Sequence, residues 1–553
     1  MKKYFSLALL FIIIAFNAQN FLPLEWQISR NHDSQNIQNQ IVKWEKINLL
    51  TSWERQGFSG FDGVCLLQSS FDIPRKYWSK KLQLQCDLKC DVHQILINNH
   101  TIANKNGTFE IQKKFLKEKN NKILIKISNL NYSGGENSNI CKLFPENIIE
   151  KSFVKIEDLS ENHIVTNYPK SLKINYFTPK IAQLKVEITN DFHKNILTKI
   201  ISLNSGKHQI DLNINSKYFK PGFYQIKFTL KNDGYISDVQ WFGINPKKIE
   251  CQSKSKPLQF DEFWQNSIQE LSKIAPNFKL KKNEELSQGT KDVYILEMNS
   301  FNNLIIRGYL FVPKNSKGKL PAILHVPGYG YGFENLDEFL NNPNNVIELA
   351  LCVRGHGLSR DYFDPNKTGP GIWGYKIFSE DENSYRGIYM DCVRAVDFLW
   401  NREDVDKTKI GVMGGSQGGG LAIATAALCK DKISACAYFD PFPTDIEDFV
   451  ELRTICKTEI KNFLNFYQNN YTWNQAIEVQ KLINAENFAD EISCPVFFIS
   501  ALLDDDCPSH VGFSVYNKIK SKKEFKIYPN DGHICDGKYN KDFMNYFKNK
   551  FNF

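Results

Sequence analysis

The chain has 553 residues, of which 42% are hydrophobic and 24% charged, and its formal net charge is +8. A single domain usually has about 100–200 residues, so we expect two to four folded units. The apolar and charged fractions are those of globular proteins and exclude a disordered chain. The net charge of +8 is spread without a dense block of Lys or Arg, so no nucleic-acid partner is expected.

The N-terminus predicts an export signal. Lys2 and Lys3 precede an apolar run from Leu7 to Phe16, and Asn17 and Ala18 follow it. A short basic segment followed by roughly a dozen apolar residues is typical of a secretory signal peptide. The run is shorter than the ~18 residues that a membrane-spanning helix needs. We therefore expect residues 1–18 to be a signal peptide, the mature chain to be periplasmic or extracellular, and no stable membrane span; a retained N-terminal anchor is the alternative.

Residues 19–148 predict a first β-sandwich. Apolar and polar residues alternate in Leu82–Cys86, Gln94–Ile97 and Lys122–Ile127, and Asn, Gly and Asp separate such runs. Alternation with a period of two is typical of antiparallel strands that bury one face. The sequence contains 13 cysteines at irregular spacing, for which buried free thiols are expected, with a bond between Cys86 and Cys90 as the alternative.

Three segments of this unit, Thr51–Gly57, Phe61–Gly63 and Ile97–Asn99, resemble the jelly-roll, galactose-binding-like domain attached to many glycoside hydrolases. The resemblance implies that Trp53 is a core residue or, alternatively, that it contacts carbohydrate. A second alternating region, with Leu184–Ile188 and Tyr224–Phe228 as examples, predicts an immunoglobulin-like sandwich over residues 149–250. The polar segment Cys251–Pro257 looks like a linker.

Residues 251–553 predict an α/β domain. We expect helices at Phe260–Leu271 and Tyr385–Trp400. The expected strands are Ala322–Val326, Ile347–Val353, Ile410–Met413, Ala435–Phe439, Val496–Ala501 and Phe525–Tyr528. Strands that alternate with helices predict a mostly parallel sheet with helices on both faces, as in an α/β-hydrolase.

A G-x-S-x-G motif, Gly414 to Gly418, lies between a predicted strand and an Ala-rich predicted helix. Such a layout exposes the central serine, Ser416, in a strained turn and directs the helix N-terminus at the reaction centre. A serine needs a base, and in this fold an acid and then a histidine follow it in the chain. His510 is too close in sequence to the expected acid, which makes His533 the predicted base. The acid is one of three consecutive aspartates, Asp504, Asp505 and Asp506.

Residues 260–553 resemble the acetylxylan esterase and cephalosporin-C deacetylase family of α/β-hydrolases. The matching segments are Phe260–Trp264, Arg354–Gly355, Tyr385–Gly387, Asp391, Arg394–Asp397, Gly415–Gly419, Asp504 with Cys507–Pro508, and Gly532–His533. The resemblance implies Ser416 as nucleophile, Asp504 as orienting acid and His533 as base. It also implies an oxyanion hole formed by the backbone N–H groups of Tyr329 and Gln417.

The chain departs from the family pattern at four positions: His356 in place of Gln, Ile534 in place of Glu, Pro327 in place of His, and Ala501 in place of Gly. His356 is expected to be structural, with a place in the substrate pocket as the alternative, and Trp373 is expected to line the acyl pocket or belong to the core. The resemblance implies an acetylated carbohydrate as substrate, acetylated xylan first, and allows a homo-oligomer. The reaction needs no metal or organic cofactor.

Two other functions are compatible with parts of the pattern. A peptidase of the prolyl-oligopeptidase type also places β structure before an α/β-hydrolase domain, but its β-propeller needs about seven repeated blades, of which the sequence shows no sign. A catalytically silent carbohydrate-binding protein would use the hydrolase fold as a scaffold. The ordered set of Ser416, Asp504 and His533 argues against the silent protein, and an exported serine esterase is therefore the predicted function.

Overall fold

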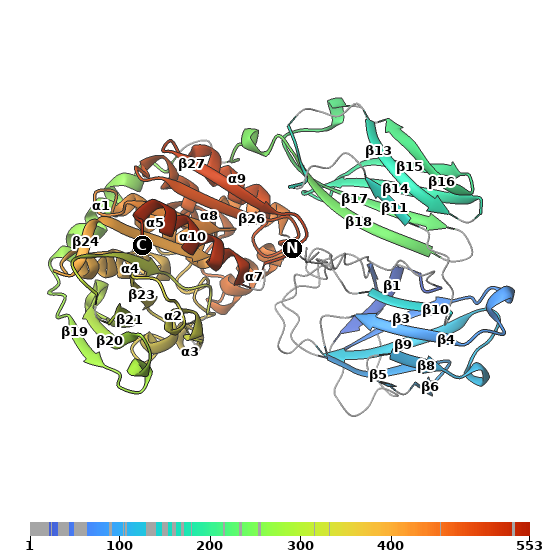
Figure 1. Ribbon diagram of the computed structural model, residues 1–553, viewed down its shortest axis with the longest axis horizontal. Helices are drawn as coiled ribbons and strands as arrows, with labels where there is room; N and C mark the ends of the chain where they lie inside the picture. Colours follow the sequence, from blue (N-terminus) through green and yellow to red (C-terminus); the bar gives the residue numbers. More distant parts are fainter. Residues whose placement is uncertain are drawn as a thin grey trace, which may run out of the picture.

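Among the described residues, the strands of the computed structural model form five β-sheets (Figure 1). The structure describes residues 21–23, 25–30, 44–48, 64–87, 91–102, 104–105, 108–128, 140–145, 153–156, 162–166, 171–178, 180–213, 216–231, 235–252, 256–314, 316–330, 332–333, 335–453, 455–533 and 537–553. The predicted signal peptide, Trp53 and the motif around it lie outside the described residues, as does Ile534.

The first β-unit contains two sheets, with strand orders β2-β1-β3-β9-β5-β6 and β10-β4-β8-β7. Its strands are β1 (Glu25–Arg30), β2 (Glu45–Asn48), β3 (Val64–Phe71), β4 (Leu82–Asp87), β5 (Asp91–Ile97), β6 (His100–Thr101), β7 (Asn104–Lys105), β8 (Thr108–Ile111), β9 (Asn121–Ser128) and β10 (Ile140–Pro145). One apolar core joins the sheets, with Leu67 and Ile125 from one and Leu84 from the other. The alternating segments are therefore strands of a sandwich, and the kinship to jelly-roll domains stays a prediction.

The cysteines follow the expectation of buried free thiols. All eleven cysteines in the described part of the chain are free, and every one of these except Cys86 is buried. Cys86 lies opposite Cys141 in the register of β4 and β10. Cys90, its predicted alternative partner, lies outside the described residues.

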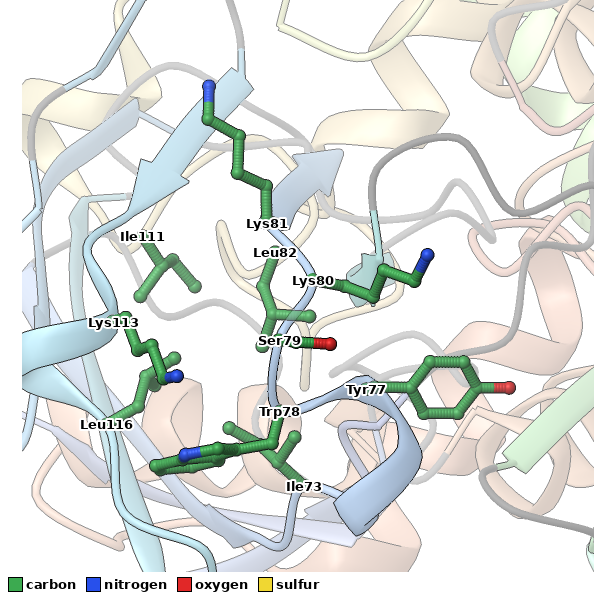
Figure 2. A pocket seen from close by; sticks show the side chains of 10 residues that line it. All are labelled: Ile73, Tyr77, Trp78, Ser79, Lys80, Lys81, Leu82, Ile111, Lys113 and Leu116. Carbon is green, nitrogen blue, oxygen red and sulfur yellow. The ribbon is translucent and has the colours of Figure 1, made fainter.

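The first unit has a shallow hollow of about 190 Å³ beside Trp78, shown in Figure 2. Ile73, Leu116 and Lys113 gather around the indole, whereas Tyr77 points away from it (Figure 2). The ammonium group of Lys113 lies 5.4 Å from the centre of the indole ring and covers its face. A sugar ring therefore cannot stack on that face unless Lys113 moves, and carbohydrate contact by this unit stays a prediction.

The second β-unit also has two sheets, with strand orders β11-β13-β16 and β12-β18-β17-β14-β15. Its strands are β11 (Phe153–Ile156), β12 (Ile164–Val165), β13 (Ser171–Thr178), β14 (Ala182–Asn190), β15 (Asn195–Leu203), β16 (Gly206–Asn213), β17 (Gly222–Lys231) and β18 (Tyr235–Ile244). Buried residues alternate along β13 and β14, as the period of two predicts. Ile174 and Ile188 belong to a core shared by both sheets. The immunoglobulin-like kinship stays a prediction.

The C-terminal half contains one nine-stranded sheet of order β19-β20-β21-β23-β22-β24-β25-β26-β27. Its strands are β19 (Lys279–Lys282), β20 (Lys291–Asn299), β21 (Ile305–Pro313), β22 (Leu320–His325), β23 (Ile347–Cys352), β24 (Val405–Gly415), β25 (Ala435–Phe439), β26 (Val496–Ala501) and β27 (Lys523–Tyr528). From β23 to β27 the pairing is parallel, as predicted. The antiparallel edge from β19 to β21 was not predicted, because hairpins rather than helices connect these strands.

Helices cover both faces of this sheet, as predicted. They are α1 (Phe260–Ser272), α2 (Asp337–Leu340), α3 (Pro365–Thr368), α4 (Ser384–Trp400), α5 (Gln417–Leu428), α6 (Ile446–Leu452), α7 (Ile455–Phe466), α8 (Trp473–Ile483), α9 (Ser509–Lys518) and α10 (Lys538–Phe551). Val412 and Met413, neighbours on β24, contribute to two separate cores, the second of which includes Phe547 of α10. Within the described ranges, none of the helices has the length and apolar character needed to cross a bilayer.

The second β-unit packs directly on the α/β domain. Phe223, Trp241 and Ile249 come from this unit or its C-terminal end, and they belong to the main core of the α/β domain. The side-chain amide of Asn517 on α9 donates to the carbonyl oxygens of Pro246 and Ile249, at 2.9 and 2.8 Å. The two bodies therefore share buried apolar surface. In Figure 1, β17 and β18 belong to the unit that lies beside the part of the α/β domain with α9 and β26.

Candidate active site

The predicted nucleophile lies in a sharp turn between β24 and α5. Ser416 has φ 58° and ψ −125°, a strained conformation for a residue with a side chain. Gly414 and Gly418 allow this turn, because a Cβ at Gly414 would lie 2.5 Å from the carbonyl oxygen of Gly418, and one at Gly418 would lie 2.6 Å from that of Val326. Ser416 itself is half-buried, so its side chain is accessible from solvent.

Hydrogen bonds on both sides hold the strained turn. The Ser416 N–H donates to the carbonyl oxygen of Phe439, the last residue of β25, at 3.0 Å. The Ser416 carbonyl oxygen accepts from the N–H groups of Gly419 and Phe442, at 2.8 and 2.9 Å. Because Gln417 begins α5, the partial positive charge of this helix terminus lies next to the serine hydroxyl.

The predicted acid and base are hydrogen-bonded to each other. The loop after β26 carries Asp504 and the loop after β27 carries His533, and His533 Nδ1 lies 2.7 Å from Asp504 Oδ2. Asp504 is 1% exposed, and its Oδ1 accepts from the N–H groups of Asp506 and Cys507, at 2.8 and 2.7 Å. Asp506 instead forms an ion pair with Arg453 at 2.6 Å. Of the three aspartates that the sequence left open, Asp504 is therefore placed to orient the histidine.

Ser416, Asp504 and His533 all lie just after the carboxyl ends of parallel strands, namely β24, β26 and β27. Ser416 Oγ lies 3.9 Å from Cys507 Sγ, in the same loop as Asp504. The imidazole of His533 lies 6.1 Å from the ring of Phe439, the residue whose carbonyl accepts the Ser416 N–H. Ligand and catalytic sites of open α/β sheets lie at this edge.

Burial and charge act in opposite directions on His533. Burial lowers the pKa of the imidazole, but the charge of Asp504, the hydrogen bond to Asp504 and the charge of Asp506 outweigh it and raise the pKa to about 9. The imidazolium that would form during general-base catalysis is therefore stabilised by its carboxylate partner.

His356 contacts the loop that carries Tyr329, through a hydrogen bond from the N–H of Gly330. It is fully buried, and its Nδ1 lies 3.0 Å from the carbonyl oxygen of Arg354, so Nδ1 carries the proton. Nε2 is then the acceptor for the N–H of Gly330 at 3.2 Å and for the side-chain amide of Gln417 at 2.9 Å. Burial lowers the pKa of His356 to about 4, which keeps the ring neutral. Protein groups thus occupy both ring nitrogens, which favours the structural role; the place in the substrate pocket stays a prediction.

The Gln417 side chain connects this histidine to the rest of the site. Its Oε1 accepts from the hydroxyl of Tyr385 at 3.0 Å, and its Nε2 also lies 3.3 Å from the carbonyl oxygen of Gly328. The two backbones expected to form the oxyanion hole are thereby held together by side chains from α4, α5 and the loop after β23. Sequence reasoning missed this role of Gln417 and Tyr385, although both lie in the segments that carry the family resemblance.

Trp373 contributes to the site through its backbone. Its indole is buried, donates to Gln480 Oε1 at 2.7 Å and packs at right angles on Phe442 and Phe463. Its N–H donates to the hydroxyl of Tyr329 at 3.1 Å, while Tyr329 remains 38% exposed. The ring is therefore part of the core, and the backbone orients the exposed tyrosine beside the serine.

The family model for acetyl xylan esterases (AXE1) matches residues 248–551, which is more than half of the chain. The chain belongs to the acetyl xylan esterase family. The family predicted from the sequence is thereby confirmed, and membership supports a carbohydrate esterase, which is a carboxylic ester hydrolase.

Individual members of the acetyl xylan esterase family resemble the chain at modest identity. Acetyl esterase Axe7A from Xylanibacter ruminicola is 26% identical over 368 residues, which cover 65% of this chain and 80% of that protein. The acetyl xylan esterase from Paenibacillus sp. R4 is 26% identical with a TM-score of 0.51, over 55% of this chain and 98% of that one. The structure of acetyl xylan esterase 1 from Thermoanaerobacterium is 25% identical with a TM-score of 0.48, over 55% and 97%. The Paenibacillus structure thus lacks a counterpart for much of this chain.

A second buried carboxyl group lies under the acid loop of this family member. Asp440 directly follows β25, and it accepts from the Ser500 hydroxyl at 2.5 Å and from the Ala501 N–H at 2.8 Å. Burial raises the pKa of Asp440 well above its usual value, and the charge of Asp504 raises it further. These two hydrogen bonds anchor the end of β26 to Asp440. Sequence reasoning missed it, although an aspartate at the end of a parallel strand is a recognisable signal.

A cavity of about 380 Å³ adjoins the serine turn of this esterase-family chain on the side of α10. Its walls include Pro327 and Gly328 before the expected oxyanion residue, and Gly415 before the nucleophile. Glu338 and Asn540, hydrogen-bonded to each other at 3.0 Å, add polar groups that sugar hydroxyls can bind.

Proposed function

We propose that the chain is an exported serine esterase that removes acetyl groups from acetylated xylan or related oligosaccharides through an acyl-enzyme. Ser416 is the nucleophile, His533 the general base and Asp504 the acid that orients it. The hydrogen bond between His533 and Asp504, next to the strained turn of Ser416, is the observation that carries this proposal. The family membership supports the ester as the bond that is cleaved.

In the first step, Ser416 Oγ attacks the acetyl carbonyl carbon while His533 Nε2 takes the hydroxyl proton. The developing imidazolium keeps its Nδ1–H directed at Asp504. The N–H groups of Gln417 and Tyr329 donate to the oxyanion, and loss of one such donor typically costs about 10²–10³ in rate. The tetrahedral intermediate then expels the sugar oxygen, which takes the proton from His533.

In the second step, a water molecule replaces the sugar hydroxyl. His533 takes a proton from this water as the water oxygen attacks the acetyl-serine, and His533 then returns the proton to Ser416 Oγ as the intermediate collapses to acetate and free Ser416. The half-buried position of Ser416 leaves room for a large leaving group. We place that sugar in the cavity beside Gly415, where Glu338 and Asn540 offer hydrogen bonds.

The arrangement of the N-terminal strands argues against a prolyl-oligopeptidase-type peptidase. A propeller repeats sheets of about four strands around an axis. The described strands before residue 250 instead form sheets of six, four, three and five strands, packed in two sandwiches. A catalytically silent binding protein remains the second candidate, because its fold would be the same.

Acetate release tests the proposed function. The full chain is incubated with acetylated xylan, with p-nitrophenyl acetate and with an aminoacyl-proline anilide. We expect acetate from xylan and nitrophenol from the small ester, but no aniline. Turnover of the anilide alone would support the peptidase. Carbohydrate binding without turnover of any substrate would support the silent binding protein.

The raised pKa of His533 predicts the pH dependence of the reaction. A proton occupies the base below its pKa, and only neutral His533 can accept the serine proton. We expect kcat/KM for p-nitrophenyl acetate to rise about tenfold per pH unit and to level off near pH 9, after subtraction of the uncatalysed rate. A limb centred near the ordinary histidine value of 6.5 would contradict stabilisation of the imidazolium by Asp504.

Removing the acceptor at His356 is expected to loosen the oxyanion hole. In His356→Leu, Gly330 and Gln417 lose the nitrogen that joins them, and we expect kcat to fall about tenfold or more with a smaller change in KM. His356→Gln is the matched control, since its carbonyl oxygen can accept from one of the two donors and should retain part of the rate. Equal kcat for His356→Leu and wild type would contradict this role.

The proposed location outside the cytoplasm rests on the N-terminal pattern. Lys2, Lys3 and the apolar run that ends at Phe16 support export. N-terminal sequencing of the protein recovered from its host tests the proposal, and a mature chain that starts near residue 19 is the expected result.

A further inference from the structure

His510 connects the acid loop to the second β-unit. It lies in the first turn of α9, six residues after Asp504, and it is 6% exposed. Its Nδ1 lies 2.7 Å from Oδ2 of Asp191, a residue 319 positions earlier in the chain. Asp191 is itself only 8% exposed. The contact is therefore a buried pair between the body that carries the catalytic acid and a body that precedes the α/β domain.

The turn that carries Asp191 is held in a defined shape. It joins β14 to β15, where the Asn190 N–H donates to the Lys194 carbonyl oxygen at 3.0 Å. The Asp191 N–H donates to the carbonyl oxygen of Phe223 at 2.9 Å, and Asp191 Oδ2 accepts from the Phe223 N–H at 3.0 Å. The carboxylate is thus fixed by its own sandwich before it meets His510.

Two neighbours of Asp191 also contact the α/β domain. The ring of Phe192 packs edge-on against the imidazole of His510, with centroids 5.1 Å apart. His193 Nε2 lies 2.9 Å from the carbonyl oxygen of Leu452 at the end of α6. Three consecutive residues of one turn therefore hold His510 and the adjacent helix end.

The interface extends to the catalytic acid. A cavity of about 20 Å³ is lined by Asp191 and Phe223 from the sandwich and by Asp504, Pro508 and His510 from the acid loop and α9. A space of this size holds about one water molecule. Asp191 and Asp504 therefore line the same small space, and the loop whose N–H groups hold Asp504 leads directly into α9.

Carboxyl groups of both bodies face His510. Burial lowers the pKa of this imidazole, but the charge and hydrogen bond of Asp191, together with the charges of Asp448 and Asp445, outweigh burial and raise it. Asp448 Oδ2 lies 3.9 Å from His510 Nε2. Without Asp191, the imidazole would lose its partner at Nδ1.

We propose that Asp191 is a positioning residue for catalysis: the second β-unit holds the acid loop through His510 and so keeps Asp504 directed at His533. The proposal rests on the proposed function, because it takes Asp504 as the orienting acid. The sandwich is then a component of the active site and not an appended module.

The test compares two variants of the full chain that each weaken the contact of α9 with the sandwich. Asp191→Ala removes the partner of His510. Asn517→Ala is the matched control, because it removes hydrogen bonds at the other end of α9, to Pro246 and Ile249. We expect Asp191→Ala to lower kcat about tenfold to a hundredfold with less change in KM, and to shift the rise of kcat/KM with pH to lower pH. Asn517→Ala should lower thermal stability and leave both readouts at the wild-type level.

Two further variants and one spectroscopic measurement separate loss of positioning from loss of folding. Asp191→Asn keeps an oxygen that accepts from His510 Nδ1–H, so it should fold and give an intermediate kcat; His510→Gln should reproduce the loss from the other side. The far-downfield proton resonance of the bond between His533 and Asp504 should weaken in Asp191→Ala, whether or not the protein turns over any ester.

Wild-type kcat and an unchanged downfield proton in Asp191→Ala would overturn the proposal. Equal loss of kcat in Asn517→Ala would overturn it too, since general loosening of the interface would then be the cause. Failure of the proposed function has a different signature, namely the absence of acetate release by the wild type, and in that case the downfield proton alone decides the inference.

Discussion

Replacing Ser416 with alanine is expected to lower kcat for acetate release from acetylated xylan by about 10⁴-fold or more. The alanine keeps the fold around the turn but removes the atom that forms the acyl-enzyme. The residual rate should come from the oxyanion hole and substrate binding alone. Enzymatic quantification of acetate, with wild type and variant at equal concentration, measures this loss.

A second serine of the same domain provides the matched control. Ser493 is exposed, and its hydroxyl donates to the carbonyl oxygen of Lys430 at 3.0 Å. Ser493→Ala should therefore keep the wild-type rate and its covalent labelling by a fluorophosphonate probe, whereas Ser416→Ala should lose both. Labelling of Ser416→Ala at the wild-type level would place the nucleophile elsewhere and refute the proposed mechanism.

Replacing Asp504 with asparagine is expected to lower kcat by about 10³–10⁴-fold. Asparagine can keep the hydrogen bonds to the loop, but it presents no negative charge to the imidazolium, and its amide can favour the wrong tautomer of His533. The pKa of His533 should fall, because Asp504 supplies both the charge and the hydrogen bond that raise it to about 9. The pH profile of kcat/KM should therefore level off at a lower pH in the variant than in wild type.

The neighbouring aspartate serves as control for this prediction. Asp505→Asn makes the same chemical change, carboxylate to amide, in the same loop. The hydrogen-bond partner of His533 Nδ1, however, is Asp504. We expect the rate of Asp505→Asn to stay within a few-fold of wild type. A loss in Asp505→Asn as large as that in Asp504→Asn would show that the two variants damage the loop and would remove the evidence for a specific acid.

The sequence could predict the surroundings of Ser416 because the residues that form them lie in one short segment. The strand, the Gly-rich turn and the Ala-rich helix around Ser416 are contiguous, and the observed β24 and α5 meet at that serine. Repeated alternation of strands and helices predicted the parallel core of the sheet for the same reason, since periodicity is a property of neighbouring residues.

The role of a single residue was harder to predict where several neighbouring residues fit the same sequence pattern. Three consecutive aspartates look alike in the sequence, and the family resemblance was needed to choose Asp504. His356 was expected to be structural. Its hydrogen bonds to Gly330 and Gln417 could not be predicted, because Gln417 lies 61 positions further along the chain. The antiparallel strands β19 to β21 are not separated by α-helices, and the strand–helix alternation that predicted the parallel strands therefore did not reveal them.

The sequence by itself determined the α/β fold of the C-terminal half, the family and the order of the proposed catalytic groups along the chain. Only the tertiary structure decided which groups contact each other across domains. His510 was set aside as too close to the acid, and the structure instead pairs it with Asp191 from the second sandwich. Short-range patterns report which residues form a strand or helix, whereas a buried pair 319 residues apart arises from the packing of two complete bodies. No local periodicity carries that information.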